Sequence, residues 1–406
     1  MKSEFRRIPL DMCGRSKGGS KKKQDQEFQP WITEREAADM ILVVGGAGYI
    51  GSVLVRELLE RGYAVKVFDR LYYGDQGIRE VLERIKLEVG DIRTMDMYVL
   101  DGVDAVINLS GLSNDPTAEY NTKANFEMNT QATEFLAKLC KRKGIRRFIF
   151  ASSCSIYDVG IGNDEKDVVL DEESPVNPKA AYSSSKYQAE KILLSLLDRD
   201  FAPVILRKGT IYGFSPRMRY DLVVNTFLKD VLSKGHLTIH YGGEMWRPLV
   251  DVRDAARAYI TCLEAEEDRV RGQIFNVVYG NFRISELALR VLEALREVDV
   301  KAELKADYRY HGVRSYRVSG KKIERALDFT PAVSVEEAVK DMVESITHYR
   351  YTDFDNPRYY NIAWMKLLEE ADKIIKVTGS VFEVMNPPSF QPTVVSALRK
   401  KQGADF

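Results

Sequence analysis

A tyrosine and a lysine four residues apart form the most reactive pair in this sequence. Tyr182 and Lys186 stand in the stretch YSSSK, and residues four apart share one face of a helix. A tyrosine has a reference pKa of about 10, so acting as a base near neutral pH requires a fall of roughly 3 units, or about 4 kcal/mol. A fixed positive charge nearby supplies such a shift. The pair therefore predicts a general base that takes a proton from an alcohol.

Ser153 is the third residue of this predicted catalytic site. It follows the apolar run 148–151, which has the composition of a buried strand. At the end of that strand its hydroxyl would bond the same substrate alcohol as Tyr182. A tyrosine and a lysine at this spacing are, on their own, more often a surface pair on a helix. The chemistry therefore depends on the elements that surround them.

The stretch 40–69 has the pattern of a strand, a glycine turn, a helix and a second strand with an acid at its end. Gly45, Gly48 and Gly51 follow the apolar run 41–44. In such a unit the first glycine permits the tight turn, the second lets a pyrophosphate approach the backbone, and the third lets the helix pack against the strand. The unit predicts a dinucleotide-binding site.

Asp69, at the end of the second strand, indicates which dinucleotide is bound. Its carboxylate would accept hydrogen bonds from the adenosine ribose hydroxyls and repel a 2′-phosphate, which favours NAD over NADP. Arg70 follows it directly and weakens this preference slightly.

Apolar runs alternate with helical patterns after Asp69, which predicts a doubly wound α/β fold with a parallel sheet. The further strands are expected at 85–89, 105–109, 148–151 and 204–206, and the helices at 95–100, 122–143, 181–197, 221–234, 253–266, 285–298 and 335–349. An aromatic stretch at 359–368 predicts a packed helix near the end. Ligands of a parallel sheet bind at the carboxyl ends of its strands.

The domain organisation follows from these patterns. We expect a basic lead-in at 1–39, a Rossmann domain at 40–210, a smaller substrate-binding lobe at 211–349 that returns some segments to the sheet, and a C-terminal extension of unassigned role at 350–406.

Composition limits the possible partners and the compartment. Lys plus Arg and Asp plus Glu each number 60, so net charge gives no reason to expect nucleic acid or an acidic membrane surface. The four cysteines lack metal or disulfide spacing, which fits a reducing cytoplasm. The four histidines are too dispersed for a metal site. No apolar run is long enough to span a membrane, and no secretory leader is recognisable.

Taken together, these motifs resemble the extended short-chain dehydrogenase/reductase family, in particular its nucleotide-sugar epimerase/dehydratase branch. The resemblance runs from about residue 40 to 348. In chain order, the motifs are GGAGYIG at 45–51, Asp69, GDI at 90–92, LSG at 109–111, FASSCSIYD at 150–158, YSSSK at 182–186 and RPLVDVRD at 247–254.

The resemblance implies roles for further residues. The implied cofactor is NAD, bound by Gly45, Gly48, Tyr49, Ile50, Gly51, Asp69, Arg70, Asp91, Ile92, Leu109, Ser110, Gly111, Tyr182 and Lys186. The implied substrate is a nucleotide-diphosphate sugar, bound by Ser113, Ser155, Asn225, Arg217, Arg247 and Arg314. Arginine suits this grip because its planar fork meets phosphate oxygens in pairs. By analogy with relatives, helices 122–143 and 181–197 would join two copies in a homodimer.

The residues after Ser153 indicate which reaction to expect. Dehydratases of the branch carry an Asp-Glu pair there, because eliminating water needs an extra acid and base. Here no carboxylate follows before Asp158, so a 4,6-dehydratase is disfavoured. We expect an NAD-dependent epimerase that acts through a transient 4-keto sugar. An NAD(P)H-dependent ketoreductase of a deoxysugar or a natural-product ketone is the alternative, and a non-catalytic NAD sensor is disfavoured because the catalytic residues are intact.

The sequence departs from the family pattern at three places. Arg207-Lys208-Gly209-Thr210 stands where the family commonly has Asn, Asp251 stands where His is common, and Asp158 replaces a Gly. We expect these positions to touch the sugar pocket or its walls. They would then indicate a substrate other than an ordinary hexose on UDP.

Overall fold

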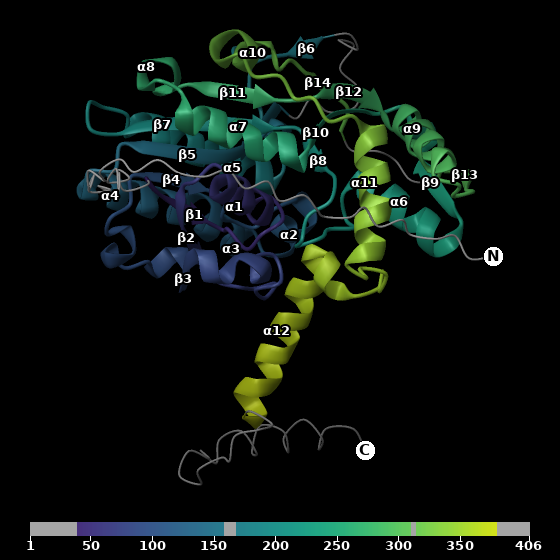
Figure 1. Ribbon diagram of the computed structural model, residues 1–406, viewed down its shortest axis with the longest axis horizontal. Coiled ribbons are helices and arrows are strands. Elements are labelled where there is room, and N and C mark those ends of the chain that lie inside the picture. The colour runs from purple at the N-terminus through teal and green to yellow at the C-terminus, as the bar shows by residue number, and fades with distance from the viewer. Residues whose placement is uncertain (1–38, 158–167, 310–313, 380–406) are drawn as a thin grey trace, which may run out of the picture. The chain divides into compact units, whose positions relative to one another are not determined.

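A computed structural model describes residues 39–157, 168–309 and 314–379. The predicted basic lead-in, Asp158 and His311 lie outside the described residues. The described chain is built on one large parallel sheet (Figure 1).

Within the described residues, seven strands form this sheet in the order β11-β7-β5-β4-β1-β2-β3, and every neighbouring pair is parallel. Its strands are β1 (Met40–Val44), β2 (Ala64–Asp69), β3 (Ile85–Val89), β4 (Ala105–Asn108), β5 (Arg147–Ser153), β7 (Ala202–Lys208) and β11 (Ile274–Val277). The strand order reverses between β1 and β4, and in open α/β sheets that reversal is where ligands bind. The predicted doubly wound α/β fold is confirmed.

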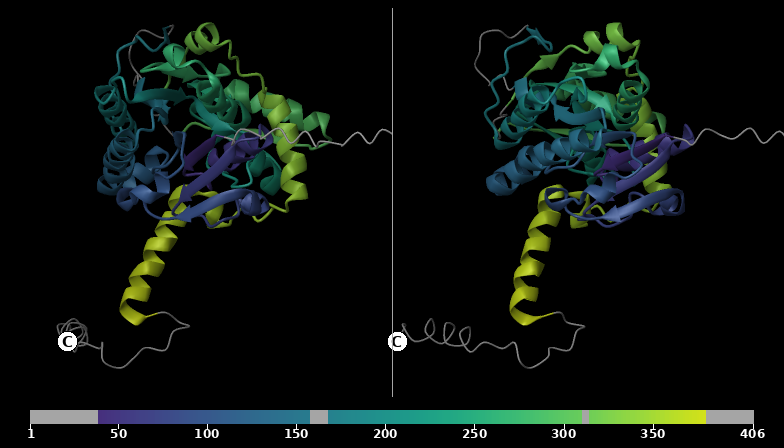
Figure 2. Two further views of the ribbon diagram at one scale, coloured as in Figure 1. Left: turned by 60° about the vertical axis from the view of Figure 1, so that its left-hand side comes forward. Right: turned by 90° about the vertical axis from the view of Figure 1, so that its left-hand side faces the viewer.

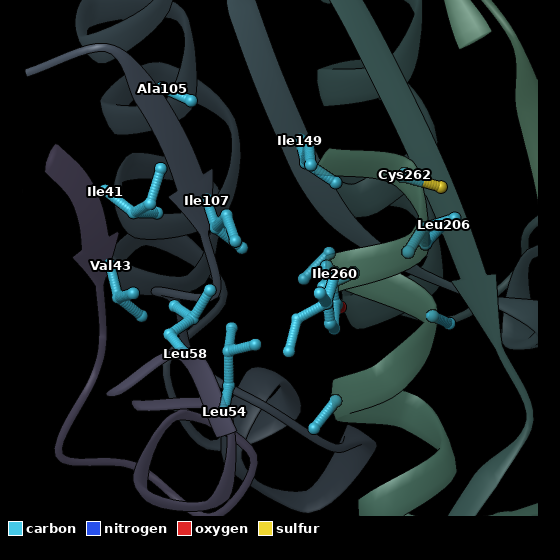
Figure 3. Packing of buried hydrophobic residues seen from close by; sticks show 14 of the residues in the cluster. Ile41, Val43, Leu54, Leu58, Ala105, Ile107, Ile149, Leu206, Ile260 and Cys262 are labelled. Atoms are coloured by element: carbon cyan, nitrogen blue, oxygen red, sulfur yellow. The ribbon is translucent and has the colours of Figure 1, made fainter. Parts of the chain in front are cut away.

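Helices cover both faces of the sheet, which explains why its strands are almost continuously apolar. On one face, shown in Figure 3, strand side chains pack against α1 (Gly51–Glu60) and α7 (Val252–Glu264). On the other face they pack against α4 (Ala132–Lys143) and α5 (Ala181–Ser195). The residues labelled in Figure 3 are Ile41, Val43, Leu54, Leu58, Ala105, Ile107, Ile149, Leu206, Ile260 and Cys262.

The predicted helices form, except for the one expected at 95–100. Helix 95–100 is replaced by short 3-10 turns at Ile92–Thr94 and Met97–Leu100. Helix 122–143 contains a π-helical stretch at Glu127–Gln131. The other helices are α2 (Asp115–Tyr120), α3 (Thr122–Phe126), α6 (Val223–Lys234), α8 (Glu267–Val270), α9 (Ile284–Glu297), α10 (Lys321–Leu327), α11 (Val335–His348) and α12 (Asn361–Thr378).

The region after β7 has a core of its own, in which α6, α9 and α11 pack together. Small sheets pair β12 (Gly280–Arg283) and β8 (Thr210–Tyr212) with β10 (Trp246–Asp251), β13 (Glu303–Asp307) with β9 (His236–His240), and β14 (Arg317–Val318) with β6 (Val169–Leu170). Strand β11 leaves this region and pairs with β7 at the edge of the large sheet.

The last described helix, α12, forms where an aromatic stretch predicted a packed helix. Its first residue, Asn361, is buried, but Leu367, Ile374 and Val377 are exposed. Figure 2 shows α12 extending away from the other helices after its first turns. Within the predicted stretch, the expected packing is therefore wrong for Leu367, and the helix continues beyond 368 with exposed apolar residues.

Candidate active site

A pocket of about 1110 Å³, part of which is open to solvent, lies at the carboxyl ends of β1, β2 and β4. All the residues that sequence analysis assigned to the cofactor line it, except for Tyr182 and Lys186. Those lining residues are Gly45, Gly48, Tyr49, Ile50, Gly51, Asp69, Arg70, Asp91, Ile92, Leu109, Ser110 and Gly111. Residues far apart in the chain therefore form one concave surface.

The glycine turn leaves no room for side chains at two of its positions. Gly45 has φ +85°, and a Cβ there would lie 2.9 Å from the backbone nitrogen of Ser110. A Cβ on Gly51 would lie 2.3 Å from the carbonyl oxygen of Gly45. At Gly48 the nearest atom would be 3.2 Å away, so this position is the more open one. The turn leads into the N-terminus of α1, whose free N–H groups favour an anion.

Asp69 is fixed at the end of β2 by backbone donors. Its Oδ2 accepts from the N–H of Ala47 at 3.0 Å and its Oδ1 from the N–H of Leu71 at 2.8 Å. Burial raises the pKa of this carboxyl, and these hydrogen bonds oppose the rise. Arg70 bonds Asp91, with Nη1 and Oδ2 2.6 Å apart. The charge of Arg70 is thus held at Asp91, one strand away from Asp69.

The predicted catalytic residues meet at the end of β5. Ser153 is the last residue of that strand, and its side chain lies close enough to Tyr182, in the first turn of α5, to influence its pKa. Burial, followed by the charge of Asp115, raises the pKa of Tyr182 to about 12, whereas Arg219, Ser153 and Arg314 act in the opposite direction. The phenol is therefore protonated at neutral pH in the protein alone.

Lys186 lies one helical turn beyond Tyr182 and is 4% exposed. Burial lowers the pKa of its ammonium group to about 8, and Glu190 opposes this shift. A Cβ on Gly111 would lie 3.5 Å from Lys186 Nζ and 2.2 Å from Asn129 Oδ1. Asn129 Oδ1 has no hydrogen-bond partner among the described residues. Sequence analysis missed Asn129, because a polar residue inside a helical pattern carries no distinct signal.

The residues assigned to the substrate do not form one group. Of these, Ser113 and Arg217 line the same pocket as the glycine turn. Asn225 is buried, and its side chain bonds Tyr49, Gly213 and the backbone of Arg219. These protein groups use the amide of Asn225 in this structure.

Arg314, Arg247 and Ser155 do not line this pocket. Arg314 Nη2 is 2.6 Å from Asp115 Oδ1. Arg247 donates to the backbone oxygens of Trp246 and Arg314. Ser155 is buried, and its N–H donates to Ser153 Oγ at 3.2 Å.

Two departures from the family pattern have structural roles that the sequence did not reveal. Arg207 forms a buried ion pair with Glu190. Asp251 is fully buried, accepts from the N–H of Arg253 at 2.8 Å and caps α7. Their expected contact with the sugar pocket or its walls stays a prediction.

The strand order, the glycine turn and the Ser-Tyr-Lys group define a dinucleotide-dependent enzyme of the Rossmann type. A model of the NAD dependent epimerase/dehydratase family matches residues 41–278. The chain belongs to this family, and its cofactor is NAD.

Relatives within the family differ in their reactions. The chain is 27% identical to dTDP-D-glucose 4,6-dehydratase of Mus musculus over 76% of this chain and 88% of the relative. It is 26% identical to a putative UDP-glucose 4-epimerase of Methanocaldococcus jannaschii over 75% and 97% of the two chains. The solved dTDP-glucose 4,6-dehydratase DesIV of Streptomyces venezuelae, with NAD bound, aligns with a TM-score of 0.65 and 26% identity over 77% and 98%. Family membership alone therefore leaves the reaction open.

The residues of the pocket fit NAD. The absence of Cβ atoms at Gly45 and Gly51, where they would meet backbone atoms, allows the tight turn at the pocket, and Asp69 stands where a ribose is bound in this fold. None of the helices in the three described ranges is both long and apolar enough to span a membrane.

Proposed function

We propose that this protein interconverts nucleotide-diphosphate sugars that differ at C4. The observation that carries the proposal is the proximity of Ser153, at the end of β5, to Tyr182, with Lys186 on the next turn of the same helix. This group can remove a proton from a sugar alcohol and later return it. The residues that follow Ser153 up to Tyr157 include no carboxylate, so β5 supplies no second acid and base for elimination.

The protein residues handle the proton and hold the alcohol. Tyr182 takes the proton of the C4 hydroxyl, and Ser153 bonds the same oxygen. NAD, when bound, supplies the hydride acceptor and donor at C4. Once the 4-keto sugar has turned over in the site, Tyr182 returns the proton to the new alcohol. The positive charges of Lys186 and of the oxidised cofactor lower the pKa of the phenol for the first of these steps.

Residues near Tyr182 are proposed to bind the substrate. Arg247 and Arg314 offer cations for a nucleotide diphosphate. The roles proposed from the sequence for Ser113, Ser155 and Asn225 stay predictions, because these residues lie at separate places in the structure. The similarity to a putative UDP-glucose 4-epimerase supports the choice of epimerisation as the reaction.

The protein is further proposed to be a cytoplasmic homodimer joined through α4 and α5. Sedimentation that gives only a monomer at micromolar concentration would reject the dimer.

A ketoreductase of a deoxysugar or natural-product ketone is the alternative, because it would use the same three residues. The two activities differ in their need for reductant. Purified protein is incubated with UDP-, GDP-, CDP- and dTDP-sugars, and the C4 epimers are separated by chromatography. The epimerase proposal expects interconversion without added reductant, whereas activity only with added NADPH would favour the ketoreductase. Tyr182→Phe should abolish interconversion and keep NAD binding.

A further inference from the structure

Arg217 lies at the cofactor pocket, next to the glycine turn. A Cβ placed on Gly77 would be 2.6 Å from the carbonyl oxygen of Ala47 and 3.1 Å from Arg217 Cβ. The backbone of Arg217 therefore runs close to the turn itself. Its guanidinium stacks on the ring of Tyr73, with Cζ 3.7 Å from the ring centroid. Both side chains line the pocket that contains Gly45 and Asp69.

Arg217 makes no direct ion pair with a carboxylate in the described residues. The residue is 5% exposed, and its Nε has no hydrogen-bond partner there. The charges of Asp69 and Asp221 act on it without such a contact, and Asp221 is bonded instead by two nitrogens of Arg219, at 2.8 and 3.0 Å. A buried cation whose charge is not directly paired is costly. An anionic ligand in the pocket would reduce that cost.

Asn361 of the C-terminal segment holds Arg217 in place. Its Oδ1 accepts from Arg217 Nη2 at 2.6 Å, and its Nδ2 donates to Ser113 Oγ at 2.8 Å. Asn361 is 3% exposed, and both it and Met365 line the pocket. These residues lie well beyond 278, where the match to the family model ends.

The segment before Asn361 is itself firmly attached. Tyr351 OH donates to the carbonyl of Pro216 at 2.9 Å, and Tyr220 OH donates to the carbonyl of Tyr351 at 2.7 Å. Tyr220 also packs edge-on against Tyr359, with ring centroids 5.0 Å apart. On the other side of Asn361, Trp364 Nε1 donates to the carbonyl of Tyr72. The first turn of α12 is thus fixed at the pocket on both sides.

We propose that Arg217, held by Asn361, binds the pyrophosphate of NAD, so that the C-terminal segment 351–365 completes the cofactor site. The sequence resemblance assigned Arg217 to the diphosphate of the substrate. Its position beside the glycine turn, where a dinucleotide pyrophosphate lies in this fold, points to the cofactor instead. The planar guanidinium suits paired bonds to phosphate oxygens. This inference rests on NAD binding and is independent of the epimerase proposal.

The test compares the binding of ADP and of adenosine to the full chain after bound nucleotide has been removed. The comparison distinguishes the loss of a phosphate contact from a general disruption of the cofactor pocket. Arg217→Met should weaken ADP binding roughly tenfold to hundredfold, as expected for loss of a charge-assisted bond. Adenosine binding should stay unchanged, because adenosine has no phosphate. Arg217→Lys keeps the charge and should recover part of the ADP affinity. Calorimetry measures all these affinities without any enzyme activity.

Asn361 is tested with a matched asparagine in the same segment. Asn361→Ala should weaken ADP more than adenosine and speed the release of NAD during dialysis. Asn356→Ala is the control, because within the described residues the side chain of Asn356 bonds Arg358 and Asp353, which do not line the pocket. The proposal is overturned if Arg217→Met leaves ADP binding unchanged, or if it weakens ADP and adenosine equally. It is also overturned if the variant weakens UDP binding to the NAD-loaded protein and leaves ADP unaffected, because Arg217 would then serve the substrate.

Discussion

Arg207 of β7 and Glu190 of α5 form an ion pair inside the protein, with Nη2 and Oε2 2.7 Å apart and side chains 3% and 1% exposed. Arg207 also donates to Tyr157 OH at 2.9 Å, and Ser152 donates to Glu190. Glu190 lies one turn after Lys186 on the helix that carries Tyr182. The pair therefore fixes the catalytic helix against the sheet.

Breaking this pair should destabilise the protein strongly. Arg207→Met leaves Glu190 buried and uncompensated, which costs about 3–5 kcal/mol. The double variant with Glu190→Met should recover much of this loss, because no lone charge remains. Denaturant unfolding measures both. Lys138→Met, which breaks the exposed pair with Glu134, is the control and should cost less than about 1 kcal/mol. A loss of similar size in the control and Arg207→Met would contradict the account.

The buried carboxyl of Asp251 should make stability depend on pH. Burial raises its pKa to about 6, despite the opposing bonds from Arg253. Because the folded pKa lies above the unfolded one, this contribution to stability is complete below the unfolded pKa of about 4 and is lost as pH rises through about 6. The Asp251→Asn variant has no titrating group at this position, so its stability does not contain this pH-dependent contribution. Between pH 4 and pH 7 the variant should gain about 2 kcal/mol relative to the unchanged protein.

Thermal or denaturant unfolding at both pH values checks this prediction. Asn keeps the acceptor that caps α7, so the cap itself is preserved in the comparison. A stability difference that does not change with pH, or that changes in the opposite direction, would show that Asp251 is already ionised in the folded protein at low pH.

Asp115 should set the pH at which Tyr182 begins to act. Its negative charge raises the pKa of the phenol, and the Arg314 charge lowers it. Since a base works in its deprotonated form, Asp115→Asn should move the rising limb of kcat/KM to lower pH. Arg314→Gln should move it to higher pH. The pH profile separates this effect from a general loss of activity, and shifts in the same direction for both variants would disprove the charge assignment.

Gly51→Ala should abolish binding of NAD. A Cβ there would meet the carbonyl oxygen of Gly45 at 2.3 Å, and this backbone cannot yield without opening the turn. Gly62→Ala is the matched control at the other end of α1. It has φ +88° and no atom within 4 Å of its Cβ position, so it should lower stability by about 1 kcal/mol and leave NAD affinity unchanged. Equal NAD affinity in both variants would refute the role of the turn.

The sequence predicts those parts of the fold and site that are determined by residues close together along the chain. The strand, turn and helix around Gly45 and the strands of the sheet are local patterns of apolar residues and glycines, so their positions were found within a few residues. The spacing of Tyr182 and Lys186 on one helix face is local as well. The grouping of the cofactor residues follows because parallel strands end at one edge of a sheet.

The sequence could not show which contacts form between distant segments. Arg207 and Asp251 are charged, and a charged residue near a strand end is normally expected to line a solvent-filled pocket. Their partners, Glu190 and Arg253, are distant or local contacts that the sequence pattern does not indicate. The bond between Arg217 and Asn361 joins residues 144 positions apart, and no periodicity predicts such a contact. The assigned boundary between residues 210 and 211 and the roles of the substrate residues stay predictions.

The fate of the hydrogen at C4 tests the central claim most directly. The purified protein, without added cofactor, is incubated with a nucleotide sugar that carries deuterium at C4, and the product is analysed by NMR. An epimerase that returns hydride to the carbon from which it came gives the C4 epimer with deuterium still at C4. Deuterium found at C6 would indicate a dehydratase, and deuterium lost to added cofactor would indicate net oxidation or reduction. Either result would contradict the proposed epimerisation.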